Sequence, residues 1–431
     1  MAKRILIIGL DGVPYSLLTS LREQGVLPNL DSVIKKGLFG SMEVCLPPIS
    51  SVSWSSFMTG KDPSYHGVYG FTDITAKYQL RFPFFADLKV PTFFDLMGEK
   101  GCQSVVINLP STYPVRAFPG VLISGFVAVE LARAVYPPSL LPRLQAMKYR
   151  VDLDLARARS DKEFLFKDLQ ATLELRRKAV DLLWKEIPWT LFMVVVTGTD
   201  RLHHYAFDSL EDPQDPHHQA FVDYYRSVDS FIGEQLDRFE KDFAGDDRLV
   251  LLLSDHGFTG LDKEVYINRL LVQKGFLAFS ADNPKMISDL DPKQTRAFAL
   301  DPGRIYVNLK GRFSNGTVEP SDREKVLEEL SDLLTNLHFN ERSVAAGVYR
   351  REDLYRGPLA EEAPDLVFLT HRGFDPKGAV ASPKVFGASG LTGMHTHDDA
   401  FYLLYASDGE VNQTPQIITD LSGIVLDWLD A

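Results

Sequence analysis

The sequence is poor in cysteine and has no long hydrophobic run. Its 431 residues include two cysteines, Cys45 and Cys102, which excludes a disulfide framework or a zinc ribbon and favours a reducing compartment. No stretch approaches the roughly 20 apolar residues of a membrane-spanning helix. The basic start at Lys3 and Arg4 precedes an apolar run shorter than a signal-peptide core. We therefore expect a soluble, cytoplasmic protein.

Positive charge is also scarce. The 46 Lys and Arg residues are outnumbered by 58 Asp and Glu residues, and the formal net charge is −12. This balance argues against a nucleic-acid polymer or an anionic membrane as the main partner. A small phosphate ester stays compatible, because bound metal ions can reverse the local field. The composition favours no particular oligomeric state.

Short apolar runs alternate with helical patterns through about residue 260. Buried strands are predicted at residues 5–10, 104–107, 121–124, 191–196 and 248–253, and amphipathic helices at about 14–24 and 161–186. This alternation is typical of a mostly parallel sheet covered by helices. We predict the α/β class, with an α/β/α sandwich around the sheet.

The pattern changes beyond residue 258. Strands at 304–309 and 366–369 and a helix at 323–337 are separated by polar connections that contain Pro and Gly. A strand at 401–405 and a helix at about 415–429 follow. We therefore expect an α/β core made of residues 1–261 and 391–431, and a partly inserted cap region at 262–390.

Carboxylates and imidazoles stand at the ends of several predicted strands. Because the carboxyl ends of parallel strands share one edge of a sheet, these side chains are expected to converge. Such a mixture of ligands suits a divalent metal. Each residue alone could instead cap a helix or be a structural imidazole, but their joint placement favours metal binding. The candidates are Asp11, Asp200 with His204, Asp255 with His256, and His395.

Ser50 stands after Pro47 and Pro48 at the start of a predicted helix that ends at Gly60. Serine is a preferred N-cap, so a capping role is the simpler alternative. The catalytic alternative uses the same position, because a helix N-terminus favours an alkoxide and phosphoryl oxygens. A nearby metal or base would have to activate the hydroxyl. The sequence contains no Gly-x-Ser-x-Gly elbow and no Gly-rich phosphate loop followed by Lys.

These motifs occur in the order seen in the alkaline phosphatase superfamily. The sequence most resembles the type I phosphodiesterase/nucleotide pyrophosphatase branch, over about residues 5–260 and 390–430. The motifs that carry the resemblance are Ile7-Ile8-Gly9-Leu10-Asp11-Gly12, Pro47-Pro48-Ile49-Ser50 through Thr59-Gly60, Asp200…His204, Ser254-Asp255-His256-Gly257 and Gly393-x-His395. The resemblance implies an alkaline-phosphatase-like fold.

The resemblance also implies a two-metal phosphoric-ester hydrolase. Ser50 would be the nucleophile and would form a covalent phospho- or nucleotidyl-serine intermediate. Zn²⁺ is the expected metal, and Mn²⁺ or Fe would suit the same ligands. One ion would be held by Asp11, Asp255, His256 and Ser50, and the other by Asp200, His204 and His395.

The sequence departs from the branch after His66-Gly67, where Phe71 stands in place of the usual phosphate-binding Asn. Asn108 could supply the missing donor, and Phe71 could stack on part of the substrate. His397 could orient His395 or the substrate. These positions leave open whether the small phosphate ester is a nucleotide.

Two other functions are compatible with the sequence. A phosphomonoesterase or a phosphoglycerate-mutase-like phosphotransferase would need cationic groups such as Arg201 or Arg304 at the phosphate oxygens. A non-catalytic, metal-binding family member is the other alternative. A sulfatase is disfavoured, because its Cys-x-Pro-x-Arg motif would start at Cys45 and Ile49 stands in place of the Arg.

Overall fold

The computed structural model of the chain describes residues 2–407, 409, 411 and 413–431. An eight-stranded sheet forms its centre, in the order β2-β21-β9-β1-β8-β5-β6-β7. Strands β9, β1, β8, β5 and β6 run parallel, whereas β21 and β7 run antiparallel to their neighbours. The mostly parallel sheet is thus confirmed. The strands are β1 (Lys3–Leu10), β2 (Leu38–Met42), β5 (Ser104–Leu109), β6 (Gly120–Ser124), β7 (Val135–Tyr136), β8 (Leu191–Val196), β9 (Asp247–Leu253) and β21 (Ala400–Ala406).

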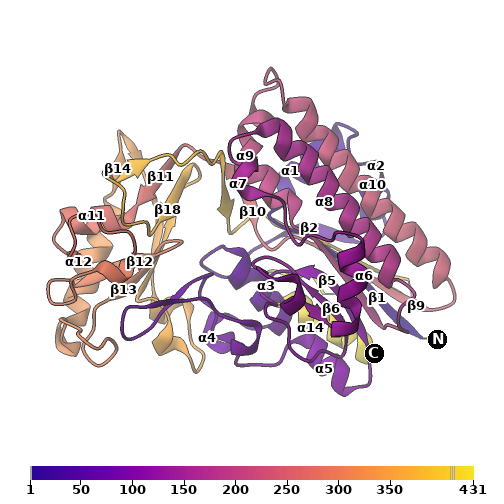
Figure 1. Ribbon diagram of the computed structural model, residues 1–431, viewed down its shortest axis with the longest axis horizontal. Coiled ribbons are helices and arrows are strands. Elements are labelled where there is room, and N and C mark those ends of the chain that lie inside the picture. Colours follow the sequence, from indigo (N-terminus) through magenta and orange to yellow (C-terminus); the bar gives the residue numbers. More distant parts are fainter. Residues whose placement is uncertain (1, 408, 410, 412) are drawn as a thin grey trace.

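Helices cover both faces of this sheet (Figure 1). Alternate residues of a strand point to opposite faces, so Leu6 and Ile8 of β1 pack in one hydrophobic cluster and Ile5 and Ile7 in the other. The predicted α/β/α sandwich is confirmed. The first cluster contains α1 (Tyr15–Glu23), α2 (Pro28–Ile34), α6 (Leu141–Ala146), α8 (Lys162–Leu183), α9 (Gly198–Glu211) and α10 (His218–Asp242); the second contains α3 (Ser50–Thr59), α5 (Phe93–Glu99) and α14 (Asp420–Asp430).

Helix α14 differs from the prediction at its start. It begins at Asp420, whereas the pattern predicted a start near residue 415. The Asp420 carboxylate accepts hydrogen bonds from the backbone N–H groups of Gln416 and Ile417, which holds the preceding residues in a turn. Within the part of the chain that the structure describes, no helix is both long and apolar enough to cross a membrane.

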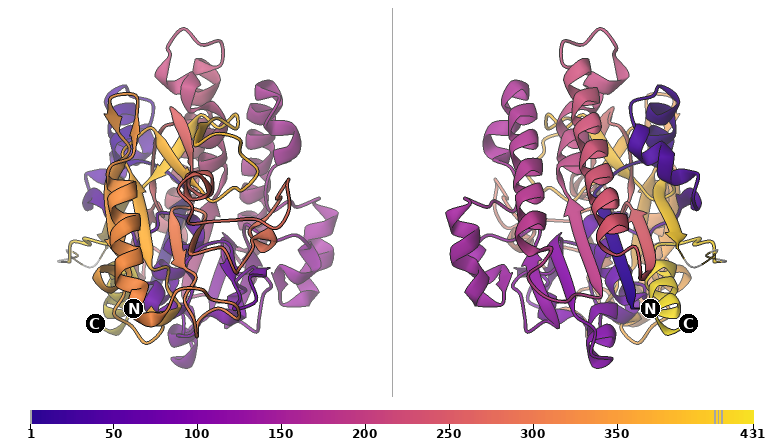
Figure 2. Two further views of the ribbon diagram at one scale, coloured as in Figure 1. Left: turned by 90° about the vertical axis from the view of Figure 1, so that its left-hand side faces the viewer. Right: turned by 90° about the vertical axis from the view of Figure 1, so that its right-hand side faces the viewer.

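Residues 262–390 form smaller sheets beside the core, on the left in Figure 1 and facing the viewer in the left panel of Figure 2. Two sheets have the orders β12-β13-β17-β16 and β18-β11-β19, and they enclose a hydrophobic cluster of their own. The elements are β11 (Lys263–Tyr266), α11 (Ile267–Gln273), β12 (Ala297–Leu300), β13 (Arg304–Val307), α12 (Arg323–Thr335), β14 (His338–Phe339), β15 (Arg342–Ser343), β16 (Ala345–Arg350), α13 (Arg351–Leu354), β17 (Leu366–Thr370), β18 (Phe374–Lys377) and β19 (Phe386–Gly387).

The chain before residue 262 also contributes to this cluster. The Tyr78 hydroxyl donates to Asn308 Oδ1 at 2.7 Å, and its ring stacks on Phe313. Tyr78 lies between two short paired strands and outside the region expected as a cap, so the two parts are interleaved. The boundaries of that region stay a prediction. The remaining short elements are α4 (Pro63–His66), β3 (Asp73–Ile74), β4 (Leu80–Arg81), α7 (Leu155–Ala158), β10 (Gly257–Gly260) and β20 (Gly393–Thr396).

Helix α2 is capped by a residue that is distant in sequence. Its own N-cap residue, Leu27, has no side chain that can accept a hydrogen bond. Instead, the Asp229 carboxylate of α10 accepts from the backbone N–H groups of Asn29 and Leu30, at 3.0 and 2.8 Å, and from the Asn29 amide at 2.9 Å. Asp229 is buried, so this contact ties two helices of one layer together.

We expect Asp229→Ala to lower the free energy of unfolding by about 1–3 kcal/mol, because buried donors lose their acceptor. Urea denaturation measures this change. The control is Asp237→Ala on the exposed side of the same helix, which we expect to stay within about 0.5 kcal/mol of wild type. Equal stability of the two variants would contradict the capping role.

Candidate active site

Three neighbouring parallel strands, β9, β1 and β8, end at one edge of the sheet, and each is followed by a buried carboxylate. Asp11 follows β1, Asp255 follows β9, and Asp200 lies in the first turn of α9, which follows β8. His256 Nε2 lies 3.8 Å from Asp11 Oδ1 and 4.0 Å from Asp200 Oδ1. The strand ends therefore meet, as expected from the topology.

Ser50 enters this group from the N-terminus of α3. Its Oγ lies 3.4 Å from Asp11 Oδ1 and 3.2 Å from His256 Nε2. The N-cap position is occupied by Ile49, and no side chain there caps the helix. Gly60 ends α3 with a φ of 62°, as predicted. The Ser50 hydroxyl thus points toward the carboxylate and imidazole and is not used for capping.

Trp54, one turn further along α3, holds the other side of Asp11. Its indole Nε1 donates to Asp11 Oδ2 at 3.1 Å, and both residues are buried. The ring lies against Gly9 of β1, where an added Cβ would be 2.7 Å from the ring. A glycine at this position therefore allows α3 to approach the strand and to deliver both Ser50 and Trp54 to Asp11.

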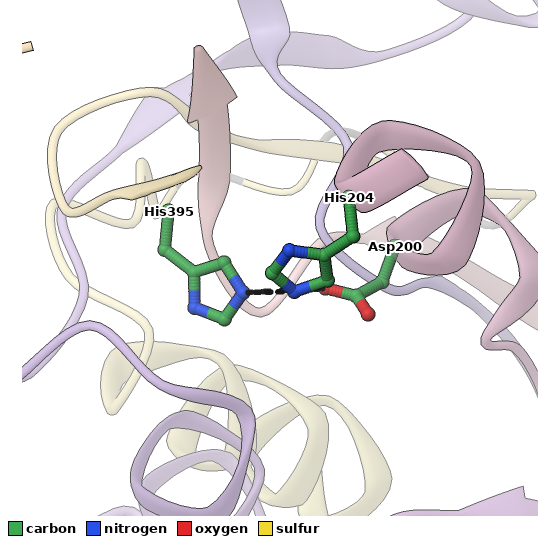
Figure 3. A group of neighbouring side chains, drawn as sticks. All are labelled: Asp200, His204 and His395. Carbon is green, nitrogen blue, oxygen red and sulfur yellow. Dashed lines mark hydrogen bonds and ion pairs between the residues drawn. The ribbon is translucent and has the colours of Figure 1, made fainter. Parts of the chain in front are cut away.

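A second group consists of Asp200, His204 and His395 (Figure 3). The Nε2 atoms of His204 and His395 lie 3.4 and 3.3 Å from Asp200 Oδ1 and 3.1 Å from each other. Asp200 and His204 are one helical turn apart, as predicted. His395 comes from β20, which pairs with β10 so that His395 lies opposite Phe258. Its Nδ1 lies 3.0 Å from the carbonyl oxygen of Pro48.

The donor atoms fit bound metal ions. Asp200 Oδ1 and Asp255 Oδ2 are buried and have no hydrogen-bond partner, which is costly for polar atoms unless an ion or water binds them. Two groups of ligand atoms lie close enough to hold a metal: Asp200 with His204 and His395, and Asp11 with Asp200 and His256. Asp200 belongs to both, a shared position that the spacing of the motifs did not indicate.

Asp255 lies at the edge of the second of these groups. Its Oδ2 is 3.4 Å from His256 Nε2, while its Oδ1 accepts a hydrogen bond from the backbone N–H of Gly12 at 3.0 Å. Gly12 has a φ of 66°, a conformation that glycine adopts at little cost. The chain turn after β1 therefore orients one oxygen of Asp255 and leaves the other facing the imidazole.

Burial sets the protonation of the site. Burial, with the negative charges of Asp255 and Asp200, raises the pKa of Asp11 well above its ordinary value, and burial raises the pKa of Asp255 to about 7. Burial lowers the pKa of His204 to about 3 and depresses that of His256 strongly. Neutral imidazoles are the form that binds metal, and a cation would relieve the repulsion among the carboxylates.

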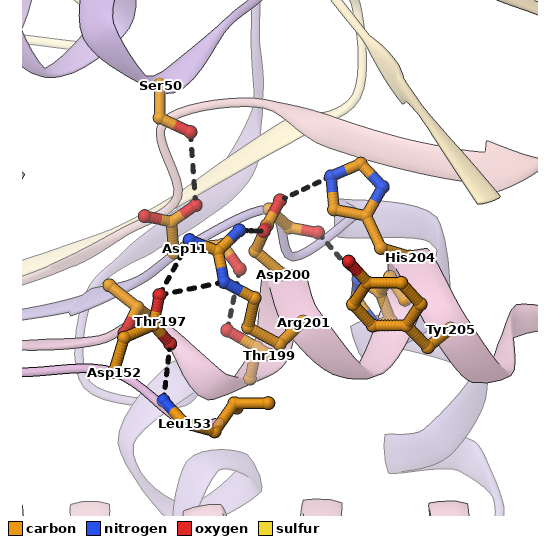
Figure 4. Close-up of polar contacts among 12 residues, drawn as sticks. Asp11, Ser50, Asp152, Leu153, Thr197, Thr199, Asp200, Arg201, His204 and Tyr205 are labelled. Carbon is orange, nitrogen blue, oxygen red and sulfur yellow. Dashed lines mark hydrogen bonds and ion pairs between the residues drawn. The ribbon is translucent and has the colours of Figure 1, made fainter. Parts of the chain in front are cut away.

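Arg201 holds the second oxygen of Asp200 (Figure 4). Its Nη1 donates to Asp200 Oδ2 at 2.6 Å, and its Nε and Nη2 donate to Asp152 Oδ2 at 3.0 and 2.8 Å. Burial would raise the pKa of Asp200, but His204 and Arg201 hold it well below its ordinary value. Because His204 is neutral near pH 7, Arg201 supplies the permanent charge. Asp200 Oδ1 is thereby left free to face the imidazoles.

The three residues predicted to contact substrate have different surroundings. The half-buried ring of Phe71 packs edge to face on Phe126, with centroids 5.3 Å apart. Asn108 is fully buried, and its amide donates to the Val195 carbonyl and the Thr197 hydroxyl, both at 3.3 Å. His397 lines a cavity beside His395. Their roles toward a substrate stay predictions.

Other residues were not found from the sequence. Asp152 stands in a loop before α8, far from every motif, and only the fold brings it to Arg201. Trp54 lies within the helix that Ser50 starts, so its place four residues after the serine is the one signal that could have indicated it.

The sequence matches the family of type I phosphodiesterases and nucleotide pyrophosphatases over residues 5–396. The chain belongs to this family. The resemblance seen in the motifs is confirmed, and the family is one of metal-dependent phosphoester hydrolases. No curated protein matches the chain in sequence.

Solved structures agree on the fold. Phosphonoacetate hydrolase from Sinorhizobium meliloti 1021 has a TM-score of 0.65 at 15% identity, with 100% of this chain and 96% of that chain covered. Murine ectonucleotide pyrophosphatase/phosphodiesterase 5 has a TM-score of 0.57 at 13% identity, with 99% and 95% covered. At these identities the similarity concerns the fold, and it confirms the alkaline-phosphatase-like architecture.

We expect the protein to bind about two equivalents of Zn²⁺ or Mn²⁺, and His395→Ala to bind about one. The substitution removes a ligand atom from the group with Asp200 and His204 and leaves Asp11 and His256 in place. Metal content after gel filtration, measured by mass spectrometry, tests this. The control is His338→Ala, which changes an exposed imidazole of β14 and should bind as wild type does. A wild-type protein without metal, or an unchanged content in His395→Ala, would refute the two-ion site.

Proposed function

We propose that the protein is a two-metal phosphodiesterase that forms a covalent phospho- or nucleotidyl-Ser50 intermediate. The observation that supports this most directly is the position of Ser50. Its Oγ lies within 3.4 Å of Asp11 Oδ1 and His256 Nε2, at the N-terminus of α3. A serine needs such neighbours to become a nucleophile, and the helix N-terminus favours the negative oxygens of its substrate.

We propose Zn²⁺ as the metal, with Mn²⁺ or Fe as alternatives that suit the same ligands. When bound, the ions would lower the pKa of the Ser50 hydroxyl and neutralise charge on the phosphoryl oxygens. One ion would be held by Asp11, Asp255, His256 and Ser50, and the other by Asp200, His204 and His395, with Asp200 close to both.

The residues of the chain then act in two steps. Ser50 Oγ gives its proton to solvent and attacks phosphorus, and the leaving group departs as an alkoxide with the electrons of its P–O bond and takes up a proton from solvent. Water next attacks phospho-Ser50 and releases the product and the serine. Trp54 keeps the Asp11 carboxylate in position during both steps, and Arg201 does the same for Asp200. Rigid side chains of this kind reduce the cost of positioning the reacting groups.

The arginines support a diester substrate over a monoester. A monoester has an additional charged oxygen that requires a cationic partner. Arg201 is bound by Asp200 and Asp152. Arg304 is fully buried beside Gly70 and donates to the Asp301 carbonyl. Because neither guanidinium is available, the phosphomonoesterase and mutase-like alternatives are less well supported.

A nucleotide is one candidate for the substrate. A structure of an inactive variant of the murine ectonucleotide pyrophosphatase/phosphodiesterase 5 contains AMP, while the bacterial relative was solved with phosphonoacetate. These ligands belong to those proteins. For this chain they support a small phosphate ester or phosphonate bound at Ser50.

We expect Ser50→Ala to lower kcat/KM for bis-p-nitrophenyl phosphate at least about 10³-fold, or about 4 kcal/mol of transition-state stabilisation. The reason is loss of the nucleophile. Release of p-nitrophenol measures the rate. Ser53→Ala is the matched control, because Ser53 is buried in the same helix and its hydroxyl has no partner. Full activity of Ser50→Ala would exclude the covalent mechanism, and an inactive metal-loaded wild type would favour a non-catalytic role.

We also expect wild type to prefer diesters over monoesters. With p-nitrophenol as the leaving group in both, kcat/KM for bis-p-nitrophenyl phosphate should exceed that for p-nitrophenyl phosphate by about tenfold or more, which corresponds to about 1.4 kcal/mol. The physical reason is that Arg201 is engaged by two carboxylates. A preference for the monoester would instead support the phosphomonoesterase alternative.

A further inference from the structure

A cavity of about 580 Å³ opens beside the group of Asp200, His204 and His395. Its volume lies in the range of sites that enclose drug-sized molecules. It is lined from the core by the residues just before Ser50 and by β20, and from the other side by residues 301–302, 346, 367–372 and 375–377. The cavity therefore lies between the catalytic core and the smaller sheets.

The cavity is in contact with only one end of the active site. His204 and His395 line it, whereas Asp11 and His256, which lie next to Ser50 Oγ, are not among its lining residues. In an in-line displacement the leaving oxygen lies opposite the attacking oxygen. Ser50 Oγ lies beside Asp11 and His256, so a phosphoryl group held between this end and His204 and His395 would direct its leaving group toward the cavity.

The lining is mainly apolar. Pro47, Pro48, Ile49 and Met394 come from the core, and the facing side contributes further apolar residues, among them Pro302, Phe368 and Leu369. A ligand group that fills this cavity would remove apolar surface of both walls from water, which favours a bulky apolar group.

The charged groups of the lining already have partners within the protein. Lys377 Nζ lies 2.5 Å from Asp375 Oδ2, and Arg372 Nη2 lies 3.1 Å from Asp398 Oδ1. The Asp301 carboxylate accepts a hydrogen bond from the backbone N–H of Gly378. An additional charge on the ligand would have to compete with these contacts. The cavity consequently favours an uncharged group.

A second pocket, next to the residue that follows Ser50, is much smaller. The pocket lined by Ser51, Phe71 and Ser111 has a volume of about 20 Å³. Of these two pockets, the one beside His204 and His395 is the one that could enclose a large group.

We infer that the cavity is the leaving-group subsite and selects phosphodiesters of bulky, uncharged, mainly apolar alcohols. This inference rests on the proposed phosphodiesterase function. Substrate selection would then depend on the residues of the 262–390 region that face the core. The group that stays on phosphorus would lie largely outside the cavity.

Ala346→Trp would fill part of the cavity from β16. We compare two substrates with the same p-nitrophenol leaving group and different retained groups: methyl p-nitrophenyl phosphate and thymidine 5′-p-nitrophenyl phosphate. Because the leaving group is shared, kcat/KM should fall for both by a similar factor of about tenfold. Ala244→Trp, at an exposed position after α10, is the matched control and should leave both rates unchanged.

A loss confined to the thymidine ester would show that the cavity holds the retained group, and unchanged rates would show that it holds neither; both results overturn the inference. If Ala346→Trp does not fold, a series of substrates measured with the wild-type protein tests the inference. The wild-type kcat/KM for methyl aryl phosphates whose phenols have matched acidity should rise with the uncharged bulk of the phenol and fall when the added group is a carboxylate; the reverse order overturns the inference. Failure of the proposed function is distinct, because metal-loaded wild type would then hydrolyse none of these diesters.

Discussion

The structure depends on burying three carboxylates at the ends of three adjacent parallel strands. Asp11, Asp200 and Asp255 are each no more than 3% exposed, and their negative charges repel one another in a region with little water. Their neighbours include the imidazoles of His204, His256 and His395 and the guanidinium of Arg201. Burying these like charges without a cation raises the free energy of the folded state, and bound cations would lower it. Metal binding should therefore stabilise this end of the sheet.

The surrounding elements orient these groups with few hydrogen bonds. α3 approaches closely because Gly9 leaves room for Trp54, and the same approach delivers Ser50 to Asp11. Arg201 binds one oxygen of Asp200 and faces the ring of Phe126 on its other side. Each contact fixes one oxygen of a carboxylate and leaves the other facing the imidazoles. Catalytic carboxylates are commonly oriented by partners of this kind.

The smaller sheets have a different relation to the chemistry. They have their own hydrophobic cluster and contribute none of the Asp and His side chains of the two candidate metal groups. Their contribution is the far wall of the cavity that reaches His204 and His395. The reacting groups thus come from the ends of the central strands, from α3 and α9, and from β20. The wall that would contact a substrate belongs to a part of the chain with weaker sequence motifs. This division agrees with the general placement of chemistry on rigid elements and selectivity on the segments around them.

The sequence by itself determined the strands of the parallel sheet and the residues at their ends. Continuous apolar runs such as 248–253 specify strands buried on both faces, and the carboxyl ends of such strands share an edge, so the amino-acid pattern alone could pair Asp11 with Asp255. Only the tertiary structure decided the shared position of Asp200, the contact of Asp152 with Arg201 and the start of α14 at Asp420. These depend on packing and hydrogen bonds between segments distant in the chain or on local turn geometry, for which periodicity and spacing contain no signal. The same reason explains why the sequence did not predict the cavity, since its walls come from separate stretches that approach one another only after folding.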